Sequence, residues 1–189
     1  DTMIVFSADH GDMLGSHRLF NKGFNMYEED NHIPLIISCP GKEKGIRQEA
    51  FVSIVDIMPT FLDFAGCEIP EEVQGKSLKP LLDGGIPENW RTEIFCEFNG
   101  YESTLLTSRM VRTKKWKYVY NPFGDDELYD MDSDPGELRN LADLKGFTHV
   151  LRRMKTKMLH CLLEYDDSIA ETTTWQSNSY GLFVSEREE

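Results

Sequence analysis

The sequence predicts an α/β protein: a mixed sheet with helices, followed by a small antiparallel β-sheet with one packed helix. In the front section, two apolar runs, Met3 to Phe6 and Ile33 to Ser38, alternate with helical patterns. From about Trp90 the chain changes to short runs rich in β-branched and aromatic residues, and a long amphipathic pattern then follows. We therefore expect an α/β domain over residues 1–90, a sheet-and-helix subdomain over 91–167 and a polar tail over 168–189.

The two front strands are continuous apolar runs, which is typical of strands buried on both faces of a largely parallel sheet. Pro40-Gly41 ends the second run, and a polar turn follows. If the first strand is central in a larger sheet, a chain that begins there exposes an apolar edge, so we expect this piece to self-associate or to be marginally stable.

Two helices are predicted behind these strands. Ser53 to Gly66 has Asp56 to cap its start, Pro59 in the first turn and Gly66 at its end. The side expected to face the sheet carries Ile57, Phe61, Leu62 and Ala65. A shorter helix, Leu78 to Leu82, is capped by Ser77 and stopped by Gly84-Gly85.

The second section reads as strands followed by a helix. Strands are expected at Glu93 to Phe98, Arg109 to Thr113, Trp116 to Tyr120 and Glu127 to Met131. The tight Lys114-Lys115 connection indicates an antiparallel hairpin, and Ser133 to Gly136 is a turn. An amphipathic helix with a basic outer face is then predicted, because apolar residues recur at helical spacing: Phe147, Val150, Leu151, Met154, Met158, Cys161 and Leu162.

Composition limits the classes of partner. The 189 residues carry a net charge of −13, which argues against general nucleic-acid binding and against anionic membrane surfaces. No apolar run approaches the roughly 20 residues that span a bilayer. An anionic substrate is compatible with this negative net charge if a metal ion and a few cationic side chains dominate the electrostatic potential at the binding site. Because residue 1 already lies in a strand pattern, we expect the natural amino terminus to lie upstream of it. The sequence does not indicate the cellular compartment.

The four cysteines are far apart and form no metal-binding pair. Cys39, Cys67, Cys96 and Cys161 are read as free thiols that are mostly buried, since unpaired cysteine is often a core residue.

The candidate chemistry begins where the first strand ends. Asp9 and His10 are adjacent there, and two adjacent ligands can face one cation. Calcium prefers oxygen ligands, and an imidazole widens the choice to Mn²⁺ or Zn²⁺. The alternative is that Asp9 caps the following turn and His10 is a loop residue.

Further candidates follow along the chain. Lys22 could hold an anionic oxygen of a substrate, or it could be a solvated surface lysine. His17 could donate a proton or contact the substrate, or it could hydrogen-bond to its loop. The predicted hairpin carries a local cluster of positive charge: Arg109, Arg112, Lys114, Lys115 and Lys117. These side chains could form a solvated hairpin tip, or they could help to attract an anion.

These residues lie within a longer block, SADHGDMLGSHRLFNKGFNMYEEDNHIPLIISCPG, which resembles the carboxyl-terminal portion of the sulfatase family in the alkaline-phosphatase-like superfamily. Further blocks agree in order and distance: SIVDIMPTFLDFAG, GKSLKPLLDG, and VRTKKWKYVYN followed by ELYDMDSDPGELRNLA. The resemblance covers roughly residues 1–145, and four ordered blocks make it specific.

The resemblance implies that Asp9 and His10 are metal ligands, that Lys22 contacts the sulfate group and, more weakly, that His17 belongs to the site. It implies a calcium ion and a formylglycine made in a C-x-[PA]-x-R motif. None of the four cysteines has that context, so the formylglycine is expected in a missing amino-terminal half, and this piece alone should be inactive.

The expected substrate is a sulfated small molecule or carbohydrate. One alternative is a phosphonate monoester or phosphodiester hydrolase of the same superfamily. Another is a non-catalytic module that binds a carbohydrate or a partner protein through the basic hairpin.

Overall fold

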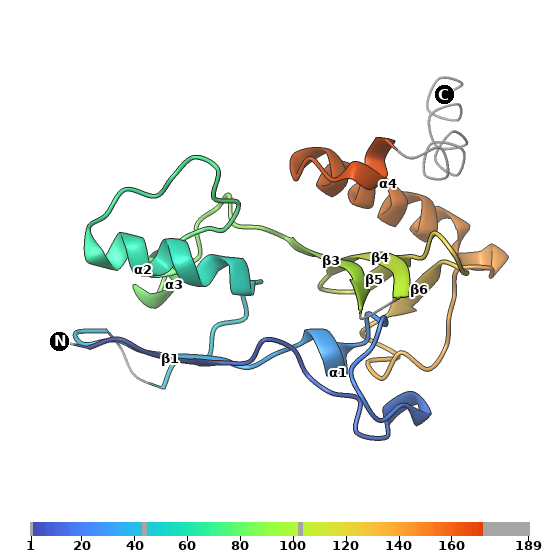
Figure 1. Ribbon diagram of the computed structural model, residues 1–189, viewed down its shortest axis with the longest axis horizontal. Coiled ribbons are helices and arrows are strands. Elements are labelled where there is room, and N and C mark those ends of the chain that lie inside the picture. Colours follow the sequence, from blue (N-terminus) through green and yellow to red (C-terminus); the bar gives the residue numbers. More distant parts are fainter. Residues whose placement is uncertain (1, 43–44, 102–103, 172–189) are drawn as a thin grey trace. The chain divides into compact units, whose positions relative to one another are not determined.

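The computed structural model describes residues 2–42, 45–101 and 104–171 (Figure 1). They form two compact units. The first contains the residues up to Gly11 and His32–Ile94, and the second contains Asp12–Asn31 and the chain from Phe95 onward. Residues 12–31 belong to the second unit because Met26 of this loop packs with Met110 and Val119 of the second unit's sheet.

In the first unit, strands β1 (Ile4–Ser7) and β2 (Leu35–Ser38) pair with each other. They run antiparallel, with Ile4 opposite Ser38 and Ser7 opposite Leu35, so the expectation of a largely parallel arrangement is wrong for these two strands. Residues 12–31 make an excursion into the second unit and return, which brings the chain back in the opposite direction.

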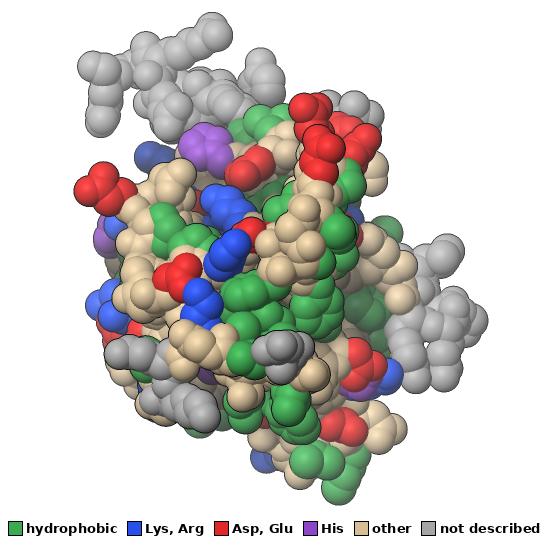
Figure 2. Space-filling view, turned by 90° about the vertical axis from the view of Figure 1, so that its left-hand side faces the viewer, with side chains coloured by type: hydrophobic (Ala, Val, Ile, Leu, Met, Phe, Trp, Pro, Cys, Tyr) green, Lys and Arg blue, Asp and Glu red, His purple; other side chains and the backbone are tan. Residues whose placement is uncertain are grey.

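The two strands are also not buried on both faces in the described structure. Ile4, Phe6 and Ile36 are exposed by 63%, 60% and 63%, because alternate side chains of a strand point to opposite faces. On the other face, Leu35 and Ile37 pack against the buried cluster of Leu78, Leu81 and Trp90. Figure 2, viewed from the side on which α2 lies, shows hydrophobic side chains gathered on the surface.

The helices of this unit are η2 (Ile54–Asp56), α2 (Ile57–Ala65) and α3 (Lys79–Leu82). Gly66 ends α2 with φ 70°, as expected, and the Ser77 hydroxyl accepts the Lys79 N–H at 3.2 Å.

The predicted inner face of α2 is wrong. Its buried residues are Pro59 and Thr60, whereas Phe61 is 47% exposed. The Thr60 hydroxyl donates to the Asp56 carbonyl at 2.6 Å and accepts the Leu78 N–H at 2.8 Å. This polar link turns the Thr60 side of the helix inward.

Asp56 is the buried centre of this unit's polar contacts. Its carboxylate is fully buried and accepts two hydrogen bonds of 2.7 Å from the Arg91 guanidinium. It also accepts the backbone N–H groups of Ser53 and Lys76, both at 2.8 Å. The charge is therefore neutralised and its lone pairs are used, which is the condition for burying a carboxylate without a large penalty.

The second unit contains a four-stranded sheet in the order β3 (Glu93–Tyr101), β4 (Thr104–Thr113), β5 (Trp116–Tyr120) and β6 (Glu127–Asp130). The antiparallel hairpin of β4 and β5 is confirmed, with Arg112 opposite Lys117. Strands β3 and β4 are longer than predicted.

Helix α4 (Thr148–Glu164) packs on this sheet (Figure 1). It buries Val150, Met154, Met158, Cys161 and Leu162, which confirms the predicted amphipathic face. The remaining elements are η1 (Ser16–Arg18), α1 (Glu28–Asn31), η3 (Lys145–Phe147) and η4 (Ser168–Glu171). Ile169 is 5% exposed in the same core, so the predicted polar tail begins as packed structure, and its part beyond residue 171 lies outside the described residues.

The basic hairpin is not a uniformly solvated tip. Arg109 is 2% exposed and donates to both carboxylate oxygens of Asp167, at 2.5 and 3.2 Å. Lys117 is fully buried between two glutamates described below. Only Lys114 and Lys115 of the five cations are exposed. The hairpin's charge is largely neutralised internally.

The cysteines are free, as predicted, but only Cys161 is buried. Burial raises the pKa of the half-buried Cys96 thiol to about 11, which keeps it protonated at neutral pH. In the described part of the chain, no helix is both long and apolar enough to cross a bilayer.

Candidate functional site

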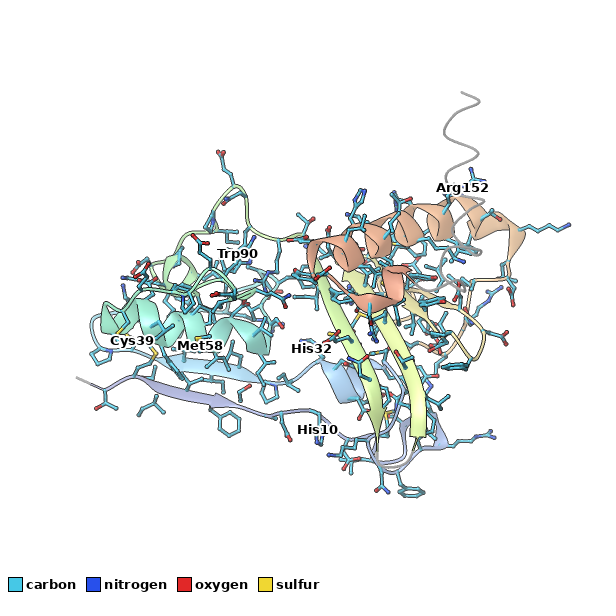
Figure 3. The ribbon with its side chains drawn as sticks, turned by 45° about the horizontal axis from the view of Figure 1, so that its top comes forward. His10, His32, Cys39, Met58, Trp90 and Arg152 are labelled. Atoms are coloured by element: carbon cyan, nitrogen blue, oxygen red, sulfur yellow. The ribbon has the colours of Figure 1, made fainter. Side chains whose placement is uncertain are left out.

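Asp9 and His10 follow the carboxyl end of β1, beyond which Figure 3 labels His10. The Asp9 Oδ2 atom lies 3.4 Å from His10 Nε2, and Asp9 Oδ1 accepts the His10 backbone N–H at 3.1 Å. The Asp9 side chain is 86% exposed and that of His10 is 38% exposed. The pair therefore presents one carboxylate oxygen and one ring nitrogen together at the surface of the first unit.

The opposite side of the His10 ring is fixed by its own loop. Nδ1 lies 2.7 Å from the Gly11 carbonyl oxygen, and a carbonyl can only accept, so Nδ1 carries the proton. This is how metal-binding histidines are usually oriented: the ring donates from one nitrogen to a carbonyl and uses the other as a ligand.

The spacing of the two donor atoms also fits a shared cation. Two ligands about 2.3 Å from one ion, at right angles, lie about 3.3 Å apart, close to the observed separation. A carboxylate oxygen with an imidazole nitrogen suits Ca²⁺, Mn²⁺ or Zn²⁺. Within the described residues, no three potential metal ligands gather around one point, so Asp9 and His10 are considered only as a pair of donor atoms.

Lys22 and His17 lie on the loop formed by residues 12–31, which belongs to the second unit. Met26 is 4% exposed and packs with Met110 and Val119 of the sheet. On the Lys22 side, the Gly23 N–H donates to the buried Asp30 carboxylate at 3.3 Å. Lys22 itself is exposed on this anchored loop.

His17 is held by a ring contact. Its imidazole stacks on the phenol ring of Tyr27, with centroids 3.7 Å apart and planes 7° from parallel. The backbone of His17 has φ 50°, and both Leu14 and Arg18 also have positive φ. Such conformations are costly for residues other than glycine and persist where surrounding contacts hold them.

Tyr27 connects this loop to the sheet. Its ring lies 6.3 Å from that of Tyr129 on β6. Burial, followed by the nearby Glu127 carboxylate, raises the pKa of the Tyr27 phenol, so it stays neutral beside His17.

A buried ion cluster provides a second anchor, which the sequence did not reveal. The Lys117 ammonium lies 2.7 Å from Glu137 Oε1 and 3.1 Å from Glu28 Oε1. The Glu28 N–H donates to Glu137 Oε2 at 2.7 Å, and Arg112 lies 3.4 Å from Glu28. Burial raises the pKa of Glu137, although the Lys117 cation opposes this. The one available signal was a lysine inside an aromatic strand, WKYVY.

Asp9 and His10 thus belong to one unit, and Lys22 and His17 to the other. Each pair lies at a defined place in its own unit: the first at a strand end, the second on a loop fixed by Met26, Tyr27 and Glu28.

The comparisons with known proteins identify the class. A family model described as "N-sulphoglucosamine sulphohydrolase, C-terminal" matches residues 15–163. The chain is 40% identical over 175 residues to an N-acetylglucosamine-6-O-sulfatase of Bacteroides thetaiotaomicron, covering 89% of this chain and 31% of that protein. It is 35% identical to human arylsulfatase K, covering 87% and 31%.

Solved structures agree with this. A putative sulfatase from Bacteroides thetaiotaomicron superposes with a TM-score of 0.83 at 31% identity, covering 91% of this chain and 38% of that one. A phosphonate monoester hydrolase from Silicibacter pomeroyi superposes with a TM-score of 0.81 at 33% identity, covering 89% and 36%.

The chain belongs to the family of carboxyl-terminal sulfatase domains, within the alkaline-phosphatase-like superfamily. It spans about a third of the length of the curated relatives it matches.

Proposed function

We propose that this chain is the carboxyl-terminal part of a sulfatase that hydrolyses sulfate esters, and that Asp9, His10, Lys22 and His17 are its contribution to the active site. The observation that carries the proposal is the geometry at the end of β1. Asp9 Oδ2 and His10 Nε2 lie side by side at 3.4 Å, and His10 Nδ1 is bound to the Gly11 carbonyl.

In this proposal Asp9 and His10 hold a divalent cation, most simply Ca²⁺, together with ligands from outside this chain. When bound, the cation acts as a Lewis acid toward the sulfate oxygens and orients the nucleophile. Lys22 neutralises non-bridging oxygens as negative charge develops. His17 is proposed to donate a proton or to contact the substrate, and its ring stacking on Tyr27, with centroids 3.7 Å apart, supports this by fixing the imidazole.

The nucleophile is proposed to be a formylglycine in the part of the protein that precedes this chain. None of the four cysteines here lies in a C-x-[PA]-x-R sequence, and the thiol of Cys96 is protonated at neutral pH. The chain on its own is therefore proposed to be inactive.

The proposed substrates are sulfated sugars or other small sulfate esters. The relatives named as sulfatases support this, and one similar structure contains a D-glucosamine-2-N, 6-O-disulfate substrate; it is 34% identical with a TM-score of 0.77.

The test uses the complete protein with 4-nitrophenyl sulfate and a measurement of bound metal by mass spectrometry. Asp9→Asn should lower both metal content and turnover, because it weakens a ligand. Lys22→Ala should lower kcat by about 10²- to 10³-fold at unchanged metal content. The matched control is Lys114→Ala, which removes an exposed lysine of the second unit and should change neither quantity. Unchanged metal content in the Asp9 variant, or unchanged kcat in the Lys22 variant, would remove that residue from the site.

A second candidate is a phosphonate monoester hydrolase, which the match to the Silicibacter pomeroyi structure favours. Both activities could use the same cation and lysine, because sulfate and phosphonate esters are tetrahedral oxyanions. The ratio of kcat/KM for an aryl sulfate to that for an aryl phosphonate in the complete protein decides between them.

A further inference from the structure

The second unit contains a pocket that no proposed site residue lines. Its volume is about 530 Å³, within the range of roughly 300–1,000 Å³ usual for small-molecule sites. Its walls come from the loop of residues 12–31, from β4, and from the segment that runs from Asn121 to β6.

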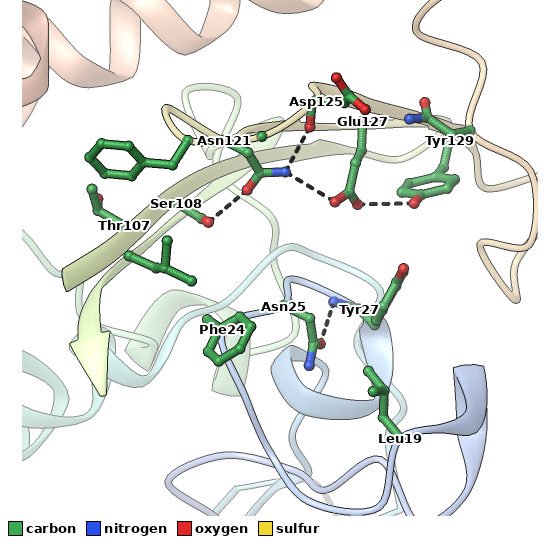
Figure 4. Close-up of a pocket in the computed structure, with 14 residues that line it drawn as sticks. Leu19, Phe24, Asn25, Tyr27, Thr107, Ser108, Asn121, Asp125, Glu127 and Tyr129 are labelled. Atoms are coloured by element: carbon green, nitrogen blue, oxygen red, sulfur yellow. Dashed lines mark hydrogen bonds between the residues drawn. The ribbon is translucent and has the colours of Figure 1, made fainter. Parts of the chain in front are cut away.

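One wall is a continuous hydrogen-bonded row, drawn across the upper part of Figure 4. The Ser108 hydroxyl donates to Asn121 Oδ1 at 2.7 Å, and Asn121 Nδ2 donates to Glu127 Oε1 at 3.0 Å. The Tyr129 hydroxyl donates to Glu127 Oε2 at 2.9 Å. Because these groups fix one another, the wall presents polar atoms in one arrangement before any ligand arrives.

The facing wall is mostly apolar. Leu19, Phe24 and Tyr27 lie across from the polar row in Figure 4. Phe24 is 52% exposed, and Phe123, another lining residue, is 71% exposed. Large aromatic faces left open beside fixed polar groups suit a ligand with one apolar face and a polar rim.

Charge limits what that ligand can be. Among the described residues that line the pocket, two are carboxylates, Asp125 and Glu127, and none is Lys, Arg or His. An anionic group would be repelled here, and a sulfate would find no cation to pair with. Sugar hydroxyl groups can donate to the carboxylate and amide oxygens of this wall, whereas the Asn121 Nδ2 group already donates to Glu127 Oε1 and to the Asp125 carbonyl.

We propose that this pocket is a subsite for an uncharged sugar ring, which stacks on the exposed aromatic side chains and hydrogen-bonds to the Asn121–Glu127 wall. The inference deepens the proposed function and rests on it for the nature of the whole substrate, a sugar carrying a sulfate ester. Tyr27 links the two places, because it lines the pocket and its ring stacks on His17. A sulfated sugar held near His17 can therefore extend its unsulfated neighbour into the pocket.

Binding is tested without turnover, in the complete protein, by saturation-transfer NMR with N-acetyl-D-glucosamine, D-galactose and D-mannose. The expected result is saturation transfer to at least one of these sugars. Phe24→Ala and Phe123→Ala should each weaken binding by roughly 3- to 10-fold, since each removes one aromatic contact. The matched control is Phe20→Ala: Phe20 is 77% exposed on the same loop as Phe24 and does not line the pocket. It should bind like the unmodified protein.

The subsite is refuted if none of the three sugars shows saturation transfer, or if Phe20→Ala weakens binding as much as the two pocket variants. In an active protein, Phe24→Ala should also raise KM for a sulfated disaccharide and leave 4-nitrophenyl sulfate kinetics unchanged. Sugar binding without turnover of any sulfate ester would refute the proposed function and leave the subsite standing. Turnover without sugar binding would do the reverse.

Discussion

Replacing Lys117 with methionine removes the cation from a site where solvent cannot replace it. The Lys117 side chain is 0% exposed, and its closer partner, Glu137, is 1% exposed at 2.7 Å. Breaking a buried ion pair from one side costs about 3–5 kcal/mol, because a charge is left uncompensated. Glu28 adds little to this figure, since its side chain is 24% exposed and Arg112 still lies beside it.

The chosen substitution isolates the electrostatic part. Methionine is nearly as long as lysine and occupies nearly the same volume, so the variant creates no large cavity. The assay is hydrogen–deuterium exchange of the amides of β5, a strand whose residues are all buried. A loss of about 3–5 kcal/mol accelerates their exchange by roughly two to nearly four orders of magnitude.

Two further variants make this prediction decisive. Lys114→Met, on the same hairpin but exposed, should change the stability by less than about 0.5 kcal/mol. Lys117→Met combined with Glu137→Gln should recover most of the lost protection, because it removes the stranded charge and keeps an acceptor for the Glu28 N–H. Equal exchange in the Lys117 and Lys114 single variants would refute the reasoning.

Three further predictions concern stability and association. Burial raises the pKa of the Glu137 carboxyl above its ordinary 4.5. Its contribution to the free energy of unfolding is therefore present below pH 4.5 and is lost as the pH rises through the folded-state pKa. Glu137→Gln should flatten the decrease of the urea-unfolding midpoint over this pH range. Gly75→Ala should destabilise the protein by about 1–3 kcal/mol, since its Cβ would lie 2.0 Å from the Val55 carbonyl oxygen, whereas Gly146→Ala, with open space around it, should fold normally in thermal melts. Light scattering of this chain expressed alone should show self-association that Phe6→Lys reduces; a monomer before the change would contradict this.

Local patterns were sufficient for the β4–β5 hairpin and for the long helix of the second unit. The β4–β5 hairpin followed from two β-rich runs joined by Lys114-Lys115, and α4 from apolar residues at helical spacing. Both depend on contacts within or between neighbouring segments, which periodicity encodes directly. The same reasoning placed Asp9 and His10 at a strand end and Lys22 and His17 on the loop that follows.

Several of the errors involve partners far away in the sequence. Arg109 is buried because Asp167 lies 58 residues further on, and Lys117 because of Glu28 and Glu137. The side of α2 that carries Thr60 is buried because the Thr60 hydroxyl accepts the Leu78 N–H. Hydrophobic periodicity carries no information about such polar pairs.

The sequence by itself determined the order of the elements, the family and the residue types available for binding a cation and a sulfate. Only the tertiary structure decided which cations are buried in ion pairs, which tautomer of His10 the Gly11 carbonyl requires, and that Tyr27 joins His17 to a pocket. The physical reason is that burial and pairing are set by groups that meet only after the chain has folded, whereas a strand or helix is set largely by its own neighbours.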